Sequence, residues 1–398
     1  MTNVGARSDA PPAGAPTYSA LEAQGYRVLG AVARGGMAEI LLAERAGAAG
    51  IKKTLVLKRL LPEYARDADF VKMFRNEARI AIELQNANIV SVFEFGEADG
   101  QLFLAMEYVH GWELARILGA CARMERQIPV EIALHIGIEI TKALSYAHDK
   151  TNAKGDSLKI VHRDVNPANV LVSTDGEVKL ADFGIARAAA HAKSTAGVWL
   201  KGKIPYMSPE QARAEPIDAQ SDLFSLGIVL WEMLAVRRLF RAPNDDRAAL
   251  LIMVREAKTP PLRSVRPDVP KDVEAIVSRA LEADKSRRYA TAKDLQAALN
   301  VALHGLRPSV SSGDVRAFLA SLELPPPLSA ATALQGERTE LVSAFPQPND
   351  TRVAVSIPAA KPAIQPRGSR WPLVVLGPAL VVSFGLSVAV ARRLPPPA

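Results

Sequence analysis

Three oxygen-bearing side chains recur along one stretch of the sequence, in "HRDVNPANVLV" and the "ADFG" that follows it. Asp164 and Asn169 are five residues apart, and Asp182 comes eighteen residues after Asp164. The intervening segments "NVLV" and "EVKLA" predict two strands, and a hairpin of that length would bring the three side chains to one end. A carboxylate, an amide oxygen and water are what a magnesium ion bridging phosphates requires. The pattern therefore predicts phosphoryl transfer, which depends mainly on positioning and charge neutralisation.

A lysine and a glutamate further upstream would place charges near those phosphates. Glu77 lies between Phe74 and Ile80 on the apolar stripe of "DFVKMFRNEARIAIELQ", where a charge must find a partner or be neutralised. The candidate partner is Lys58, at the end of a predicted strand and on the same face as Val56. Either residue alone is more often a solvated surface charge, and the downstream motif is what favours the ion pair.

The elements that must position these residues change in character along the chain. "YRVLGAVA", "AEILLAE" and "TLVLKRL" predict short strands, and the stripe around Glu77 predicts one helix. After about residue 112 the pattern becomes mostly helical, as in "PVEIALHIGIEITKALSYAHDK" and "SDLFSLGIVLWEMLA". We therefore expect an α+β chain with a small strand-rich lobe, a larger helical lobe and a ligand-binding cleft between them.

The two ends of the chain differ from this folded part. The predicted parts are a disordered lead-in (residues 1–25), the folded domain (26–304), a helical extension capped at Ser312 or Asp314 (305–324), a Pro/Ala-rich linker (325–370), a transmembrane helix (371–391) and a short outer tail (392–398). The segment from Trp371 to Ala391 has no charge and is long enough to cross a bilayer. A buried core helix is the alternative, disfavoured because the segment stands alone behind the linker.

The composition limits the cellular compartments and the kinds of binding partner that the protein can have. Cys121 is the single cysteine among 398 residues, which excludes a disulfide within one chain and fits a reducing compartment. The net charge of +7 suits an acidic partner such as a nucleotide or an anionic lipid. Because no basic run with interleaved aromatic residues stands out, we expect no nucleic-acid partner.

Five motifs together carry a family resemblance. "TLVLK", "HRDVNPAN", "DFG", "YMSPE" and "SDLFSLG" occur in that order within residues 26–304. They resemble the motifs of the Hanks-type (eukaryotic-like) bacterial serine/threonine protein kinases. The resemblance implies the bilobal protein kinase fold, ATP and Mg²⁺ as cofactors with Mn²⁺ as an alternative ion, and protein substrates that carry Ser or Thr.

The resemblance also implies roles for individual residues. Asp164 accepts the proton of the substrate hydroxyl, and Lys58 holds the α- and β-phosphates while it pairs with Glu77. Asn169 and Asp182 bind magnesium. The residues implied around the nucleotide are Val32, Ala33, Gly35, Gly36, Ile40, Val56, Lys58, Glu77, Met106 behind the adenine, Glu107 and Val109 in the hinge, and Leu171.

Further correspondences lie outside the nucleotide pocket. Glu210 and Arg288 match the family's structural salt bridge, and Asp222 matches its buried helix-cap aspartate. Arg163 is expected to bind a phosphate on the activation segment. The available phosphate acceptors there are Thr195 and Ser194.

Two positions depart from the family pattern where the phosphoryl group is transferred. Asn166 stands where a lysine normally neutralises the γ-phosphate, and Lys203 stands where threonine is usual. In the family's fold these positions face each other, so we expect Lys203 to supply the missing cation and Asn166 to take a neutral hydrogen-bonding role. Ala33 and Ala38 replace two glycines of the phosphate loop, which predicts weaker or slower nucleotide handling.

These observations predict a single-pass, membrane-anchored serine/threonine kinase that autophosphorylates, with its kinase domain in the cytoplasm because it needs ATP. The alternative is a nucleotide-binding pseudokinase that acts as a membrane-held scaffold, which the retained Lys58, Asp164 and Asp182 disfavour. Tyrosine specificity is disfavoured because "NPAN" and "PYMSPEQ" resemble the serine/threonine pattern. Gly377 and Gly385 lie near one face of the predicted membrane helix, which makes a homodimer a candidate assembly.

Overall fold

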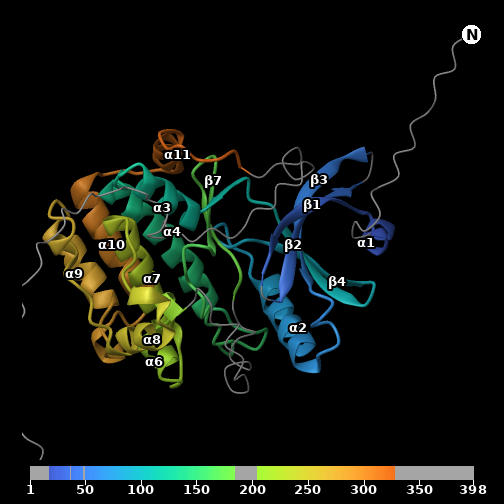
Figure 1. Ribbon diagram of the computed structural model, residues 1–398, viewed down its shortest axis with the longest axis horizontal. Coiled ribbons are helices and arrows are strands. Elements are labelled where there is room, and N and C mark those ends of the chain that lie inside the picture. Colours follow the sequence, from blue (N-terminus) through green and yellow to red (C-terminus); the bar gives the residue numbers. More distant parts are fainter. Residues whose placement is uncertain (1–17, 36, 48–49, 184–203, 328–398) are drawn as a thin grey trace, which may run out of the picture. The chain divides into compact units, whose positions relative to one another are not determined.

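The computed structural model of this chain describes residues 18–35, 37–47, 50–183 and 204–327, which form a small and a large lobe (Figure 1). Gly36, Ser194, Thr195 and Lys203 lie outside the described residues. So do residues 328–370 of the predicted linker, the predicted transmembrane helix and the outer tail. Within the described ranges, no helix combines the length and apolar character needed to span a membrane.

The small lobe is built on a five-stranded antiparallel sheet in the order β1-β2-β3-β5-β4. β3 is central in this sheet, so its backbone is hydrogen-bonded on both sides. The strands are β1 (Tyr26–Arg34), β2 (Ala38–Ala46), β3 (Lys52–Leu60), β4 (Val92–Ala98) and β5 (Gln101–Glu107).

The main helix of the small lobe is α2 (Ala68–Glu83). Asp67 caps its first turn by accepting hydrogen bonds from the backbone N–H groups of Asp69 (2.9 Å) and Phe70 (3.3 Å). Phe74 is fully buried in an apolar cluster with side chains of β3 and β5. Glu77 follows on the same face of the helix, so the packing of Phe74 carries a carboxylate into the interior.

A short helix, α1 (Ser19–Ala23), precedes the first strand. Leu21 is buried in the same apolar cluster as Tyr26 and Phe103 of the sheet. The prediction of a disordered lead-in up to residue 25 is therefore wrong for this helix. A single buried leucine makes no periodic pattern, which is why the sequence signal is weak here.

The large lobe is mostly helical and is centred on α4 (Val130–His148) and α7 (Ala219–Ala235). Both helices are buried around most of their circumference, as expected for helices in the interior of a lobe. Around them lie α3 (Leu114–Arg123), α6 (Pro209–Ala212), α8 (Arg247–Glu256), α9 (Lys271–Ala280), α10 (Ala292–Leu306) and α11 (Ser312–Ala320). The predicted arrangement, a strand-rich small lobe followed by a helical large lobe, is confirmed.

A three-stranded sheet in the order β6-β7-β8 lies in the large lobe. Its strands are β6 (Gly111–Glu113), β7 (Val170–Ser173) and β8 (Val178–Leu180). β7 and β8 form the predicted hairpin, and the backbone N–H of Ala181 donates to the carbonyl oxygen of Asn169 at 2.8 Å. Asn169 and Asp182 therefore lie side by side at one end of the hairpin, as the sequence predicts.

The segment between α2 and β4 ties the small lobe to this hairpin. The backbone N–H of Leu180 donates to the carbonyl oxygen of Asn88 (2.8 Å), and that of Val90 donates to the carbonyl oxygen of Leu180 (3.0 Å). The side-chain amide of Asn88 also donates to the carbonyl oxygen of Val178 (3.0 Å). Because this segment directly follows α2, it holds the end of α2 close to the strand that precedes Asp182.

The predicted helical extension contains α11, but its cap differs from the expectation. The N-cap residue is Ser311 rather than Ser312 or Asp314. Oδ2 of Asp314 accepts hydrogen bonds from the backbone N–H (2.8 Å) and the hydroxyl (2.9 Å) of Ser311. Asp314 thus completes a capping box from the third helical position.

Candidate active site

The ammonium group of Lys58 lies between two carboxylates. Its Nζ is 2.8 Å from Oε1 of Glu77 and 2.8 Å from Oδ1 of Asp182. Lys58 is 6% exposed and Glu77 is 4% exposed, so both charges are removed from water. Burial alone would lower the pKa of Lys58, but Asp182 and Glu77 outweigh it and raise the pKa. The predicted pair of Lys58 and Glu77 is confirmed, and Asp182 is a second partner that the sequence did not indicate.

Each of the three charges is held by a different element. Lys58 is in β3, in register with Ile40 of β2 and Leu104 of β5. Glu77 is on the buried face of α2. Asp182 follows β8 in a left-handed conformation, with a φ of +57°, which aspartate adopts more readily than most residues. The ion pairs therefore connect a strand and a helix of the small lobe with the hairpin of the large lobe.

The predicted catalytic base, Asp164, contacts one of the predicted metal ligands. The side-chain amide nitrogen of Asn169 donates to Oδ2 of Asp164 at 2.8 Å and to its carbonyl oxygen at 2.8 Å. Asp164 is 9% exposed, so its carboxylate is oriented inside the site rather than in bulk water. The structure thus brings Asp164, Asn169 and Asp182 together through the hairpin and the loop that precedes it.

Asn169 and Asp182 fit the oxygen-rich set of ligands that Mg²⁺ prefers. Because the amide nitrogen of Asn169 is bonded to Asp164, the amide oxygen is the atom of that side chain that can bind a cation. Among the residues that the structure describes, no group of three or more His, Cys, Asp or Glu side chains is arranged to hold a metal. The other ligands of a magnesium ion at this place would be phosphate oxygens and water.

The backbone of the loop before Asp164 is held by Asp222 of α7. The backbone N–H of His162 donates to Oδ2 of Asp222 (2.8 Å), and that of Arg163 donates to Oδ1 (2.7 Å). Nε2 of His148 lies 2.9 Å from Oδ2. Asp222 is fully buried, as predicted, and its bonds hold Arg163 at a left-handed φ of +66°.

His162 joins this loop to the segment that carries Asp182. Burial lowers its pKa, although Asp222 and Asp164 act in the opposite direction, so the ring is neutral. Nδ1 accepts from the backbone N–H of Asp164 (3.3 Å), and Nε2 donates to the carbonyl oxygen of Ala181 (3.1 Å). The ring also packs on Phe183, with 4.5 Å between ring centroids. This role of His162 was not predicted, and only its place in "HRD" could have indicated it.

Asn166 turns back into its own loop. Its side-chain amide nitrogen donates to the carbonyl oxygen of Asp164 (2.9 Å), and its Oδ1 accepts from the backbone N–H of Ala168 (2.9 Å). The residue is 6% exposed. Both polar atoms of the side chain are therefore hydrogen-bonded to the backbone of the loop.

Arg163 has a half-buried side chain whose Nε is buried without a hydrogen-bond partner among the described residues. Burial lowers the pKa of this guanidinium, with Asp222 acting in the opposite direction. The proposed phosphate acceptors Thr195 and Ser194 lie outside the described residues. Phosphate binding by Arg163 stays a prediction.

The residues predicted around the adenine come from the small-lobe sheet and from β7. Val32 and Val56 pack in one apolar cluster with Leu29, Leu42 and Tyr108. Met106, Glu77 and Asp182 line a common small cavity. Ala33 of β1 pairs with Ile40 of β2, and the backbone N–H of Gly35 donates to the carbonyl oxygen of Ala38 (2.8 Å). Glu107 is the last residue of β5, Val109 lies two residues beyond it, and Leu171 is in β7.

Two charged residues of the β6-β7-β8 sheet, Lys179 and Glu113, were not predicted as site residues. Lys179 of β8 places its Nζ 3.0 Å from Oε1 of Glu107. Burial raises the pKa of Glu113, while Arg116 acts to lower it and Asp182 acts to raise it further. The position of Lys179 between buried residues of a predicted strand was the available signal.

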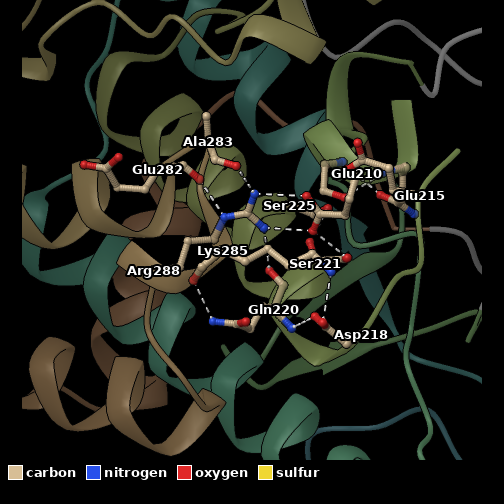
Figure 2. Close-up of polar contacts among 12 residues, drawn as sticks. Glu210, Glu215, Asp218, Gln220, Ser221, Ser225, Glu282, Ala283, Lys285 and Arg288 are labelled. Carbon is tan, nitrogen blue, oxygen red and sulfur yellow. Dashed lines mark hydrogen bonds and ion pairs between the residues drawn. The ribbon is translucent and has the colours of Figure 1, made fainter. Parts of the chain in front are cut away.

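A second buried ion pair supports α6 (Figure 2). Arg288 donates from both terminal nitrogens to Glu210, at 2.8 Å and 3.0 Å, and Ser221 adds its hydroxyl at 2.6 Å. The guanidinium also donates to the carbonyl oxygens of Glu282 (2.6 Å) and Ala283 (3.1 Å). Burial alone would raise the pKa of Glu210, but the bonds from Arg288 and Ser221 lower it to about 2. The predicted salt bridge is confirmed.

Comparisons with known proteins agree on one kind of domain. A family model described as "Protein kinase domain" matches residues 26–299. Tyrosine-protein kinase MasK of Myxococcus xanthus is 39% identical over 278 residues, which are 70% of this chain and 43% of that protein. Serine/threonine-protein kinase PrkC of Bacillus subtilis is 36% identical over 279 residues, 70% of this chain and 40% of that protein. The chain thus spans less than half the length of these curated relatives.

The fold also resembles solved structures. The crystal structure of the PknI kinase domain of Mycobacterium tuberculosis is similar with a TM-score of 0.52 and 28% sequence identity. The similarity covers 70% of this chain and 95% of that chain. The two lobes described above are therefore those of a known bilobal fold.

The pair of Glu210 and Arg288 predicts a pH-dependent contribution to stability. Because folding lowers the pKa of Glu210 from 4.5 to about 2, the stabilisation is fully present above pH 4.5 and is lost as the pH falls toward 2. The full contribution is on the order of 3 kcal/mol. Urea unfolding from pH 7 to pH 3 should therefore show that Glu210→Gln destabilises the protein most at neutral pH and progressively less in acid. The exposed Glu215→Gln is the control, and a difference that stays constant with pH would contradict the assignment.

Proposed function

Since this chain belongs to the protein kinase family, we propose that it transfers the γ-phosphoryl group of ATP to serine and threonine hydroxyls of proteins. The observation that carries the proposal is the bridge from Lys58 to both Glu77 and Asp182, at 2.8 Å each. The bridge places the positive charge of Lys58 beside Asp182, which we propose binds magnesium. The proposed catalytic base, Asp164, is in turn hydrogen-bonded to Asn169, the other proposed metal ligand.

Each residue has a distinct task in the proposed reaction. Lys58 binds the α- and β-phosphates of ATP, and Glu77 keeps its ammonium group in place. Asp164 accepts the proton of the attacking hydroxyl while Asn169 fixes the orientation of its carboxylate. Magnesium, when bound by Asn169 and Asp182, neutralises charge on the phosphates.

A nucleotide-binding pseudokinase is the second candidate function. The replacement of lysine by Asn166 and the alanines of the phosphate loop favour it. The contacts among Lys58, Glu77 and Asp182 support the active enzyme instead, because these are the charges that phosphoryl transfer uses.

The relatives differ in the acceptor that their names state. MasK is named a tyrosine-protein kinase and PrkC a serine/threonine-protein kinase. We assign serine and threonine to this chain because "NPAN" and "PYMSPEQ" resemble the serine/threonine pattern. Autophosphorylation sites on Thr195 or Ser194, beside the proposed phosphate-binding Arg163, would agree with that assignment.

Removing either the ammonium group of Lys58 or the carboxylate of Asp164 should abolish the activity. Lys58→Met and Asp164→Asn are each expected to lower autophosphorylation with Mg²⁺ and labelled ATP roughly 100-fold or more, because each removes a group that acts on the reacting atoms. Lys53→Met, an exposed lysine of the same strand, is the matched control and should retain full activity.

Mass spectrometry of the labelled protein identifies the acceptor. Phosphate on serine or threonine supports the proposal, and phosphate confined to tyrosine would replace it with the tyrosine-kinase alternative. A wild-type chain that binds ATP without transferring phosphate would instead support the pseudokinase.

We further propose that Lys203 supplies the cation that Asn166 lacks. Asn166 is bonded to its own loop, which supports a neutral role for it. A charge aimed at the transferring phosphoryl group acts mostly in the transition state, so it affects kcat more than the KM for ATP.

Lys203→Thr should therefore lower kcat roughly 100- to 1,000-fold with a modest rise in KM, by analogy with the loss of one oxyanion donor. The double variant Asn166→Lys with Lys203→Thr restores the usual family arrangement and should recover much of the lost rate. Lys201→Thr, two residues away, serves as the control. A wild-type rate for Lys203→Thr would show that Lys203 has no part in transfer.

We also propose that residues 371–391 anchor the chain in the cell membrane as a single pass, with the kinase domain in the cytoplasm. The support is the uncharged segment from Trp371 to Ala391, of a length that spans a bilayer. Gly377 and Gly385 near one face of such a helix would favour a homodimer.

Full-length protein should remain in the membrane fraction after a carbonate wash, because a spanning helix is not removed by high pH. Deleting residues 371–398 should release a kinase that is still active, since the catalytic residues lie before residue 300. Release of the full-length chain by carbonate would contradict a spanning anchor.

A further inference from the structure

Residues 307–327 continue beyond the part of the chain that matches the kinase family, yet they are folded onto the large lobe. The family match ends at residue 299. Four side chains from this extension are buried in the main apolar core of the lobe. They are Val315, Phe318, Leu319 and Leu322. The extension is therefore part of the folded domain and not a free continuation of it.

The beginning of α11 is in close contact with the turn between β7 and β8 (Figure 1). Gly176 in this turn has a φ of +84°, and a Cβ there would lie 2.0 Å from the carbonyl oxygen of Ser312. No side chain can be accommodated at that distance, so turn and helix are fixed against each other. This turn is the far end of the hairpin whose other end carries Asn169 and Asp182.

The segment that follows α11, Ser321–Pro325, is here called the strap. Arg126 donates from its guanidinium to the carbonyl oxygen of Ser321 at 2.8 Å. The indole Nε1 of Trp112 donates to the carbonyl oxygen of Pro325 at 2.7 Å. The strap thus leads from the end of α11 to β6.

β6 follows the hinge closely and belongs to the same sheet as Leu171 of β7. Trp112 pairs with Val172 of β7, and Glu113 pairs with Leu171, the residue proposed to contact the adenine. A Cβ at Gly111 would lie 2.0 Å from the carbonyl oxygen of Val172, so the two strands pack too closely to shift independently. The extension therefore contacts this sheet twice, at β6 through the strap and at the β7–β8 turn through α11.

We propose that α11 and the strap are a positioning element for nucleotide binding, and that Trp112 is the positioning residue that connects them to the hinge. The proposal rests on the proposed ATP-dependent activity. Holding β6 fixes the register of Leu171 and of the hinge against the adenine. Loosening the strap should weaken ATP binding while the transfer step, performed by Lys58, Asp164 and Asp182, keeps its rate.

A brace that only stabilises the large lobe is the alternative. A brace of that kind would lower the melting temperature when it is weakened, without a selective change in the KM for ATP. The two roles therefore differ in how KM and kcat respond.

The test compares full-length variants. Trp112→Phe keeps an aromatic ring and removes only the indole donor, and a second variant replaces residues 324–327 with Gly-Ser-Gly-Ser. The matched loop control makes the same replacement at residues 152–155, which are exposed. Trp231→Phe is the second control, because this core indole has no hydrogen-bond partner among the described residues.

Both strap variants should raise the KM for ATP, and the Kd for Mg·ATP measured by calorimetry, about three- to tenfold. Their kcat should stay within about twofold of wild type, since the reacting groups are unchanged. The loop control should leave KM and Kd unchanged. Trp231→Phe should lower the melting temperature and leave KM unchanged, which separates lost stability from lost positioning.

Wild-type KM and Kd in both strap variants would overturn the positioning role and leave the proposed kinase activity intact. A fall in kcat at unchanged KM would overturn it as well, because the strap would then act on transfer. If the wild-type chain neither binds ATP nor transfers phosphate, the proposed function fails first and this inference fails with it.

Discussion

The buried ammonium group of Lys58 is the constraint on which the rest of the site depends. A strand, a helix and the segment after a hairpin each place one charge within 2.8 Å of its partner. If β3 and α2 moved apart, the buried pair of Lys58 and Glu77 would be broken, and breaking a buried ion pair typically costs about 3–5 kcal/mol. The arrangement is also unbalanced, because two carboxylates face one cation. The residual negative charge would attract the divalent cation that we propose Asp182 binds.

The carboxylate of Asp222 holds the loop that carries Asp164 in place. It accepts backbone N–H groups of His162 and Arg163, which keeps Arg163 in a left-handed conformation that costs roughly 1–3 kcal/mol. The neutral ring of His162 then joins the loop to Ala181, next to Asp182. The loop held by Asp222 and the segment that carries Asp182 are therefore connected through His162. The orientation of Asp164 consequently depends on α7, deep in the large lobe. This explains why groups that never touch a substrate are buried so completely.

Local patterns in the sequence were sufficient for much of this site. The apolar segments "NVLV" and "EVKLA" predict the hairpin that joins Asn169 to Asp182. The helical stripe around Glu77 predicts its pair with Lys58. The bond from Lys58 to Asp182 could not be predicted in the same way, since it spans 124 residues and depends on how the lobes pack. The inward turn of Asn166 was equally inaccessible, because it follows from the loop backbone and not from residue type. α1 and the strap have too few apolar residues to show the hydrophobic periodicity of a helix or strand. Only their contacts with the folded domain reveal them.

The docking of α11 changes where this folded unit ends. A protein that ends at residue 299, where the family match stops, would lose the end of α10. It would also lose α11, which packs on the large lobe. The surface now covered by Val315 and Phe318 would then be a contiguous apolar patch, and patches of that kind drive self-association. Aggregation of such a fragment would say nothing about the integrity of the catalytic site. A boundary placed after Leu322 retains the buried side chains of the extension, so the packing extends the domain beyond the end of the family match.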